Sequence, residues 1–265
     1  MTPSLRLHLG LFYLFLYLPI AVLVVLSFNR AGLPTAWTGF STEWYGKLAG
    51  NPAILRATLN SLIVAACATL LATLLGTALA LGIEARRQAS AFLDGLMLAP
   101  MIIPDIVLAI ALLSFFTLLK FTLGLHSIVL AHTVFDLAFV TAVVRTRLKN
   151  FERSLIEASI DLGATQLQTL RHVTLPIIAP GILAAALLAF TLSIDEFIIA
   201  WFTAGAGRAS TTLPMQIYAM IRFGVTPEIN ALATLLMLAS FTAVLLAQRL
   251  DPPGRLTRSS CLVGR

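Results

Sequence analysis

The chain carries little charge for its length. Only 11% of its 265 residues are charged and 58% are hydrophobic, whereas a soluble domain has about 25% charged residues. This scarcity of charge excludes an ordinary soluble fold. We therefore expect a polytopic membrane protein that lies in lipid.

Reactive side chains are also scarce. The two cysteines, Cys67 and Cys261, lie far apart, so no disulfide framework is predicted. The four histidines are scattered, which argues against a zinc site, and we expect no bound metal or cofactor. The sequence has no G-x-x-x-x-G-K-[ST] loop for ATP phosphates and no enzyme motif. We predict that the chain is not an enzyme and that any ATP hydrolysis takes place in a partner subunit.

Long apolar runs are abundant. A helix needs about 20 apolar residues to cross the hydrocarbon core. Six stretches qualify: Leu9–Phe28, Ala57–Ile83, Leu96–Leu119, Phe121–Val144, Ile177–Thr203 and Ile229–Ala247. No A-x-A cleavage site follows the first, so we expect it to be retained. The sequence predicts an all-α polytopic membrane protein with six transmembrane helices, forming a single transmembrane domain over residues 1–265.

The basic residues predict the orientation. If the N-terminus is cytoplasmic, twelve of the 18 Lys and Arg residues lie in cytoplasmic segments. Cytoplasmic loops carry an excess of such residues, so both termini are predicted to be cytoplasmic. The same bias explains the net charge of +6 without nucleic acid.

Small residues recur in the second span. Ala72, Gly76 and Ala80 are four residues apart, which lets a neighbouring helix approach closely. We expect packing within the bundle, and a dimer seam is the alternative.

A polar stretch, residues 151–176, interrupts the apolar chain. Within it, Ser154 with Glu157 and Thr165 with Gln168 each have the spacing of a capping box. The sequence therefore predicts two short helices between the fourth and fifth spans.

The ends of these helices are also predicted. Gly163 falls where the first should stop, because only glycine adopts the left-handed conformation cheaply, and Pro176 can begin the next span. A helix this short is unstable alone. It must pack either on the bundle's own end or on a soluble partner.

This stretch resembles the "EAA" loop of ABC importer permeases. The family pattern is E-A-A, three residues, G, nine residues, I, one residue, L-P. The chain keeps the spacing and departs only at Ser159 and Val173, where Ala and Ile are expected. The matching positions are Glu157, Ala158, Ser159, Gly163, Leu175 and Pro176.

The resemblance implies that residues 151–176 form a coupling loop that docks on a dimer of ATP-binding cassette subunits. Other segments, including "PMIIPDIVLAIAL" and "LAFTLSIDEFIIAWFTAG", are similar to spermidine/putrescine importer permeases of the second-subunit type. The further partners implied are a second permease, an extracytoplasmic solute-binding protein and membrane lipid. The implied location is the bacterial inner membrane.

Four acids lie inside the predicted spans: Asp105, Asp136, Asp195 and Glu196. Ionisable groups in a span are costly unless paired or hydrated, so they are functional candidates. None has a basic residue in its own apolar run, and we predict a pathway for a cationic solute. Asp195 and Glu196 are adjacent, so they would point about 100° apart on a helix, and only one would line the pathway.

Two of these acids have structural alternatives. Asp105 follows Pro104, where a kink would expose backbone carbonyls that the acid could serve. Asp136 lies four residues after His132, and a hydrogen bond between them that joins two helices is the expected role. A proton relay is the alternative.

Two segments outside the spans are distinctive. Residues 29–55 carry Trp37, Trp44 and Tyr45, which either anchor at the lipid headgroups or contact a binding protein. Leu213–Gly224 is predicted to be a short amphipathic helix.

Two other function classes remain open. The chain could be an ABC permease for another small solute. It could also be an ion-coupled secondary transporter, although no matching pair of broken helices is found in its two halves.

Overall fold

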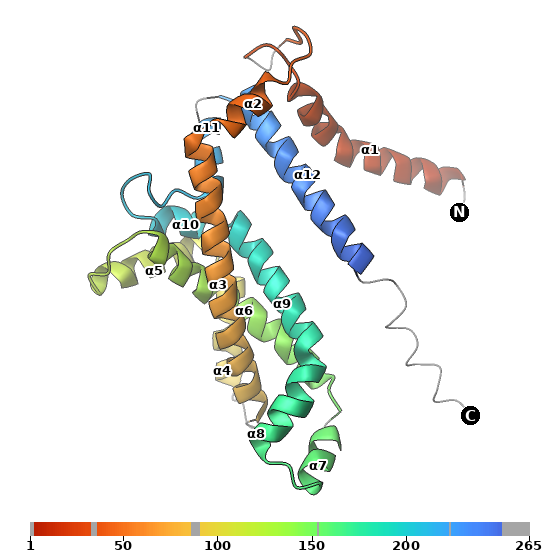
Figure 1. Cartoon of the computed structure of the whole chain (residues 1–265), viewed down its shortest axis with the longest axis vertical. Helices are drawn as coiled ribbons and strands as arrows, with labels where there is room; N and C mark the ends of the chain where they lie inside the picture. The colour runs from red at the N-terminus through yellow and green to blue at the C-terminus, as the bar shows by residue number, and fades with distance from the viewer. Residues whose placement is uncertain (1–2, 33–35, 86–90, 153, 223, 251–265) are drawn as a thin grey trace. The chain divides into compact units, whose positions relative to one another are not determined.

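The computed structural model describes residues 3–32, 36–85, 91–152, 154–222 and 224–250, and most of these are helical (Figure 1). Within these ranges there is no β-strand, and a single β-bridge joins Asn29 to Phe40. Four helical runs in the same ranges are long and apolar enough to cross a membrane: Ser4–Leu26, Pro52–Ala85, Leu125–Lys149 and Gln166–Asp195. The prediction of an all-α membrane protein is confirmed, and the count of six spans stays a prediction.

The chain divides into two compact units. One consists of residues 1–52 and 217–265, and the other of residues 53–216. Each unit is described by itself, and residues 53–216 contain most of the predicted functional residues.

In the unit of residues 53–216, helix α6 (Leu125–Lys149) is central. It packs against α9 (Leu175–Asp195), α4 (Ala91–Ile102), α10 (Ile198–Thr203) and α5 (Asp105–Leu118). Twelve of its residues are buried, and polar side chains are among them. A membrane helix that buries polar groups must satisfy them within the protein. The buried polar residues of α6 are therefore candidates for a functional role.

The small residues of α3 (Pro52–Ala85) pack against α6. Ala72 and Ala80 are fully buried in one core with Val140 and Val144. The Thr141 hydroxyl of α6 donates to the carbonyl of Gly76 over 3.3 Å. These contacts confirm the prediction of packing within the bundle.

Gly76→Ala is expected to destabilise this unit by about 1–3 kcal/mol, the usual cost of overpacking. A Cβ at Gly76 would lie 2.8 Å from Cγ1 of Val140 and 3.3 Å from the carbonyl oxygen of Leu137. Thermal unfolding of the purified protein measures the loss. Gly82→Ala is the matched control, because a Cβ there meets nothing within 4 Å. Equal unfolding temperatures for the two variants would contradict the close α3–α6 contact.

The predicted third span is not one helix. It was expected as a kinked helix over Leu96–Leu119, but α4 ends at Ile102 and α5 begins at Asp105. Pro104 lacks a backbone N–H and disfavours the helical conformation of Ile103, which explains the break. Pro100 is tolerated inside α4.

The predicted fifth span is broken as well. Helix α9 ends at Asp195, Glu196 is extended with ψ 117°, and α10 begins at Ile198. Two of the expected spans are thus interrupted beside acidic residues.

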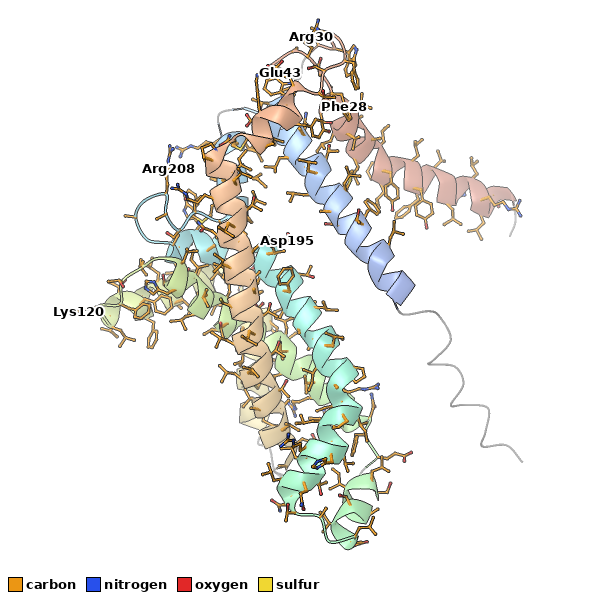
Figure 2. The ribbon with its side chains drawn as sticks, in the orientation of Figure 1. Phe28, Arg30, Glu43, Lys120, Asp195 and Arg208 are labelled. Carbon is orange, nitrogen blue, oxygen red and sulfur yellow. The ribbon has the colours of Figure 1, made fainter. Side chains whose placement is uncertain are left out.

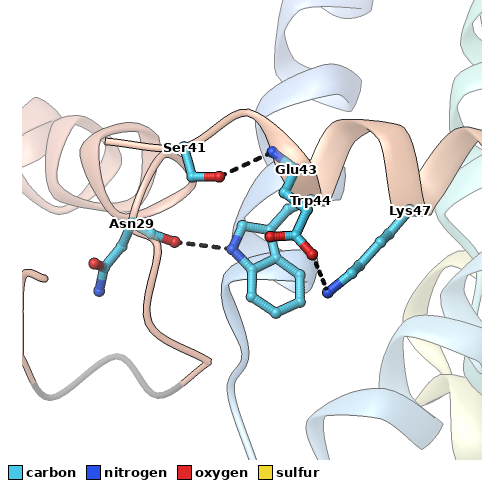
Figure 3. A network of polar contacts seen from close by, with 5 residues as sticks. All are labelled: Asn29, Ser41, Glu43, Trp44 and Lys47. Carbon is cyan, nitrogen blue, oxygen red and sulfur yellow. Dashed lines mark hydrogen bonds and ion pairs between the residues drawn. The ribbon is translucent and has the colours of Figure 1, made fainter. Parts of the chain in front are cut away.

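The other unit contains α1 (Pro3–Leu26), α2 (Glu43–Ala49) and α12 (Pro227–Leu250), and α12 contacts both α1 and α2. A polar network holds the start of α2 (Figure 3). The indole Nε1 of Trp44 donates to the carbonyl of Asn29 over 2.8 Å, and the Glu43 N–H donates to Oγ of Ser41. Lys47 bonds Glu43 at 2.8 Å, which holds the pKa of that carboxyl below its usual value.

The predicted aromatic segment contains α2, and the predicted amphipathic segment contains α11 (Leu213–Ile221). The Tyr45 hydroxyl lies 2.7 Å from Oγ of Ser27, whereas Trp37 is exposed. Helix α11 (Leu213–Ile221) forms as predicted, with Pro214 near its start and Gly224 beyond its end. Whether the aromatics meet lipid or a binding protein stays a prediction.

Candidate functional site

Three of the four predicted acids come together in the unit of residues 53–216. Asp105 is the first residue of α5, and Glu196 lies between α9 and α10. Helices α5 and α10 pack directly on each other. Both helices also contact α6, which carries Asp136. The acids at the two helix breaks and the acid in the middle of α6 therefore lie on elements that contact one another.

Asp136 is the most unusual of the three. Its side chain is fully buried, and neither carboxylate oxygen accepts a hydrogen bond from the residues that the structure describes. Buried carboxylates are normally paired, because an unpaired one costs several kcal/mol. Such a residue in a membrane helix is a functional candidate.

The predicted hydrogen bond between His132 and Asp136 is wrong. Nδ1 of His132 lies 2.8 Å from the hydroxyl of Ser193 on α9 and forms a hydrogen bond with it. Both residues are buried, so this bond joins α6 to α9. The spacing of four residues correctly placed His132 and Asp136 on one buried face of α6. No pattern in the sequence indicated Ser193.

The interruption between α9 and α10, rather than rotation along one helix, separates Asp195 from Glu196. Oε1 of Glu196 accepts a hydrogen bond from the backbone N–H of Ile199 over 2.9 Å and so caps α10. Asp195 is exposed at the end of α9 (Figure 2). Glu196 is thus the member of the pair that the structure brings to the other acids.

The polar stretch forms the two short helices that the sequence predicts, and we call residues 154–169 the elbow. Helix α7 (Ser154–Asp161) ends before Gly163, which has φ +86°. The N–H of Gly163 donates to the carbonyl of Ile160, and that of Ala164 donates to the carbonyl of Ser159. These two bonds define a Schellman motif, whose left-handed residue is usually glycine.

One of the two predicted capping boxes forms. In α8 (Gln166–Thr169), the N–H of Gln168 donates to the Thr165 hydroxyl, and the N–H of Thr165 donates to Oε1 of Gln168 over 2.8 Å. The box predicted for Ser154 and Glu157 is wrong, because Ser154 is itself the first residue of α7 rather than the residue before it. Glu157 is exposed instead.

The elbow exposes apolar side chains. Helix α7 has no buried residue, and Leu162 and Leu167 are 89% and 73% exposed. The bundle therefore buries no side chain of this helix completely, and docking on a soluble partner stays a prediction. Exposed apolar groups rimmed by polar ones are typical of an interaction surface.

A wide helical turn connects the elbow to α9. Residues Leu170–Thr174 form a π-helix, in which the N–H of Leu175 donates to the carbonyl of Leu170. Pro176 follows and can donate no hydrogen bond, and its ring would clash with the carbonyl four residues earlier. The wider turn relieves that clash, and π-turns are often found at functional sites.

Ser159, one of the two departures from the EAA pattern, has a structural role. Its hydroxyl lies 3.0 Å from that of Thr169, which is 4% exposed. This hydrogen bond ties α7 to α8, a contact that alanine at position 159 could not make. No pattern in the sequence indicates Thr169.

Ser159→Ala is expected to loosen the elbow without unfolding the bundle. A side-chain hydrogen bond contributes about 1 kcal/mol, so amide hydrogen exchange in α7 should rise about five-fold. Hydrogen–deuterium exchange of the purified protein measures it. Adding Thr169→Val should cause little further increase, because the bond is already lost. Additive effects of the two substitutions would mean that the hydroxyls act independently.

The chain is 43% identical over 233 residues to the putrescine transport system permease protein PotI of Escherichia coli strain K12, covering 85% of this chain and 82% of that protein. It is 40% identical to the spermidine/putrescine transport system permease protein PotC of the same strain, covering 89% of each.

Solved structures show the same fold. A chain of a bacterial ABC transporter that imports the acidic polysaccharide alginate superposes with a TM-score of 0.72 at 14% identity, covering 94% of this chain and 98% of that chain. Residues 68–252, more than half of the sequence, match the family model. The chain belongs to the family of binding-protein-dependent transport system inner membrane components.

Proposed function

We propose that the chain is one permease of an ABC importer for a polyamine and forms half of its transmembrane pathway. Two relatives at 40–43% identity carry putrescine or spermidine/putrescine transport in their names. A second argument comes from Asp105, Asp136 and Glu196, which we call the acid cluster. Their negative charges suit a cationic solute such as a polyamine.

The group of Asp105, Asp136 and Glu196 carries this proposal. In the part of the chain that the structure describes, none of these three acids forms an ion pair with Lys or Arg. A polyamine carries an ammonium group at each end of an alkyl chain. Such a solute supplies the cationic partners that buried carboxylates need.

The breaks in the helices support a transport path rather than a static core. Irregular backbone at membrane depth is tolerated where it is buried in protein or lines a hydrated cavity. Two breaks occur next to Asp105 and Glu196. Asp195 stays a candidate for the mouth of the pathway.

The elbow is proposed as the contact with the ATPase. Glu157, Ala158, Ser159, Gly163, Leu175 and Pro176 would form or position this coupling loop. Closure of an ATPase dimer can shift the permease only if the loop contacts the closed and open dimers differently. Its exposed α7 face supports docking, and the Schellman turn and the Ser159–Thr169 bond would transmit the displacement to α9.

The proposed assembly contains two ATP-binding cassette subunits, a second permease and an extracytoplasmic solute-binding protein. The chain would cross the bacterial inner membrane six times, with both termini in the cytoplasm and the elbow on that side. The family membership supports these partners, and the charge bias supports the orientation.

Co-purification tests the assembly, and a ligand screen tests the solute. An ATP-binding cassette subunit and a second permease should co-purify with the tagged chain. The cognate binding protein should bind putrescine or spermidine in preference to neutral amino acids and sugars. A binding protein that prefers a neutral solute would instead support the second candidate, an ABC permease for another small molecule.

A further inference from the structure

Three threonines of α3 have buried hydroxyl groups that are not used within the chain. Thr69, Thr73 and Thr77 follow one another at four-residue spacing, so they form a single row along α3. Their hydroxyl oxygens are buried and make no hydrogen bond with the residues that the structure describes. Thr58 of the same helix instead donates to the carbonyl of Ile54 over 2.9 Å. The hydroxyls of the threonine row are therefore available to a ligand.

The packing of α3 against α6 shows what lies level with this row. Val64 of α3 shares a core with Ile128 of α6, and a Cβ at Gly76 would lie 2.8 Å from Cγ1 of Val140. Each residue of α6 is 64 positions after its partner on α3, so the two helices run parallel in one register. This register places Asp136 level with position 72, and so within the threonine row.

Asp136 and His132 belong to the row of α6 that packs with α3. Four-residue steps from Ile128 pass through both residues to Val140. His132 is 1% exposed and Asp136 0%. Nε2 of His132 and both carboxylate oxygens of Asp136 have no hydrogen-bond partner among the described residues. Such atoms are rare in a packed interior, and here two neighbouring helices carry them at the same depth.

The threonine row continues to a pocket at the elbow. Leu81 and Ala85 are the next two members of the row, and both line a pocket of about 510 Å³ to which the elbow contributes Thr169. The charged residues among its described lining, Glu84 and Glu157, are both acidic. A cation that moves from Asp136 along the row would therefore arrive in a pocket without basic side chains in its described lining.

The chemistry of the row suits ammonium groups. An ammonium group only donates hydrogen bonds, and hydroxyl and carboxylate oxygens accept them. Consecutive threonines of the row are about 6 Å apart along the helix. The two nitrogens of putrescine are separated by five single bonds of about 1.5 Å, which span about 6 Å when extended. One diamine can therefore contact two acceptors that are one helical turn apart, whereas the charge of Asp136 disfavours an anion.

We propose that Thr69, Thr73 and Thr77 are solute-binding residues, which accept hydrogen bonds from the ammonium groups of a polyamine as it moves from Asp136 toward the pocket at the elbow. Thr73 and Asp136 bind one ammonium group together, and Thr77 accepts a bond from the other. This inference rests on the polyamine solute proposed above and adds the residues that recognise the spacing of its charges.

Thr73→Val tests the proposal, because valine keeps the shape of threonine and removes the acceptor. The complex is reconstituted in vesicles with saturating binding protein, and the initial rate of radiolabelled putrescine uptake is measured. The rate should fall about ten-fold, since hydrogen bonds from charged donors are the stronger kind. Thr73→Ser keeps the hydroxyl and should restore most of the rate. Thr58→Val is the matched control on the same helix, and it should leave uptake unchanged.

The outcomes separate this inference from the proposed function. Normal uptake by both Thr73→Val and Thr77→Val, with impaired uptake by Asp136→Asn, would overturn the role of the threonine row and leave the polyamine pathway in place. Equal losses in Thr73→Val and Thr73→Ser, or a loss that follows a lower unfolding temperature, would also overturn it. Normal uptake by Asp136→Asn as well would count against the cation pathway itself.

Discussion

Asp136→Asn is expected to lower polyamine uptake at least about ten-fold, which needs only about 1.4 kcal/mol of lost stabilisation of the passing cation. Asn keeps the size of the side chain but removes its charge. The carboxylate is fully buried and accepts no hydrogen bond from the described residues. The substitution therefore removes an attraction for the passenger without breaking an internal bond.

The stability of the same variant separates transport from structure. An unpaired buried charge opposes folding, so Asp136→Asn should unfold at the same or a higher temperature than the parent. Glu196→Gln should behave alike, because its amide oxygen can still accept the bond from Ile199 that caps α10. Radiolabelled uptake and thermal unfolding are measured on the same preparations.

Glu43→Gln is the control for these acids. Glu43 is exposed and its partner is Lys47 on its own helix, so uptake should not change. Normal uptake by both Asp136→Asn and Glu196→Gln would refute the cation pathway. If uptake falls only in variants whose unfolding temperature also falls, the acids have a structural role instead.

A series at Gly163 is expected to uncouple ATP hydrolysis from uptake in a graded order. Gly163 has φ +86°, a conformation that costs most residues about 1–2 kcal/mol and that Asn tolerates better. Uptake per ATP hydrolysed should fall from Gly to Asn to Ala to Val. Valine should cost at least about ten-fold, because a β-branched residue is the least compatible with this turn.

A clash at the Cβ does not explain such a series. A Cβ on Gly163 would meet no atom within 4 Å, so the cost of the alanine variant comes from the backbone conformation. The bundle should keep its unfolding temperature, because the turn is exposed. Equal uptake per ATP across all four residues would contradict the role of the elbow.

The sequence predicts well what depends on local chemistry. Gly163 ends a helix in both the prediction and the structure, because its φ requirement is a property of the turn itself. The small residues of α3 also pack as expected, because small side chains allow a neighbouring helix to approach closely. The capping box of Thr165 forms because both partners lie within one turn.

Features that depend on tertiary contacts could not be predicted. His132 bonds Ser193, 61 residues away, rather than Asp136, and nothing local distinguishes these partners. The tie between Ser159 and Thr169 likewise appears only after the elbow folds. The sequence identified all the acids of the cluster, but which of them meet depends on how α5, α6 and α10 pack.

Uptake into sealed vesicles tests the account most directly. The complex is reconstituted with its binding protein, and radiolabelled putrescine is supplied on the side of that protein. The account predicts uptake when ATP is present on the cytoplasmic side of the complex, and none when a proton or sodium gradient is supplied without ATP. Uptake driven by either gradient alone would contradict it.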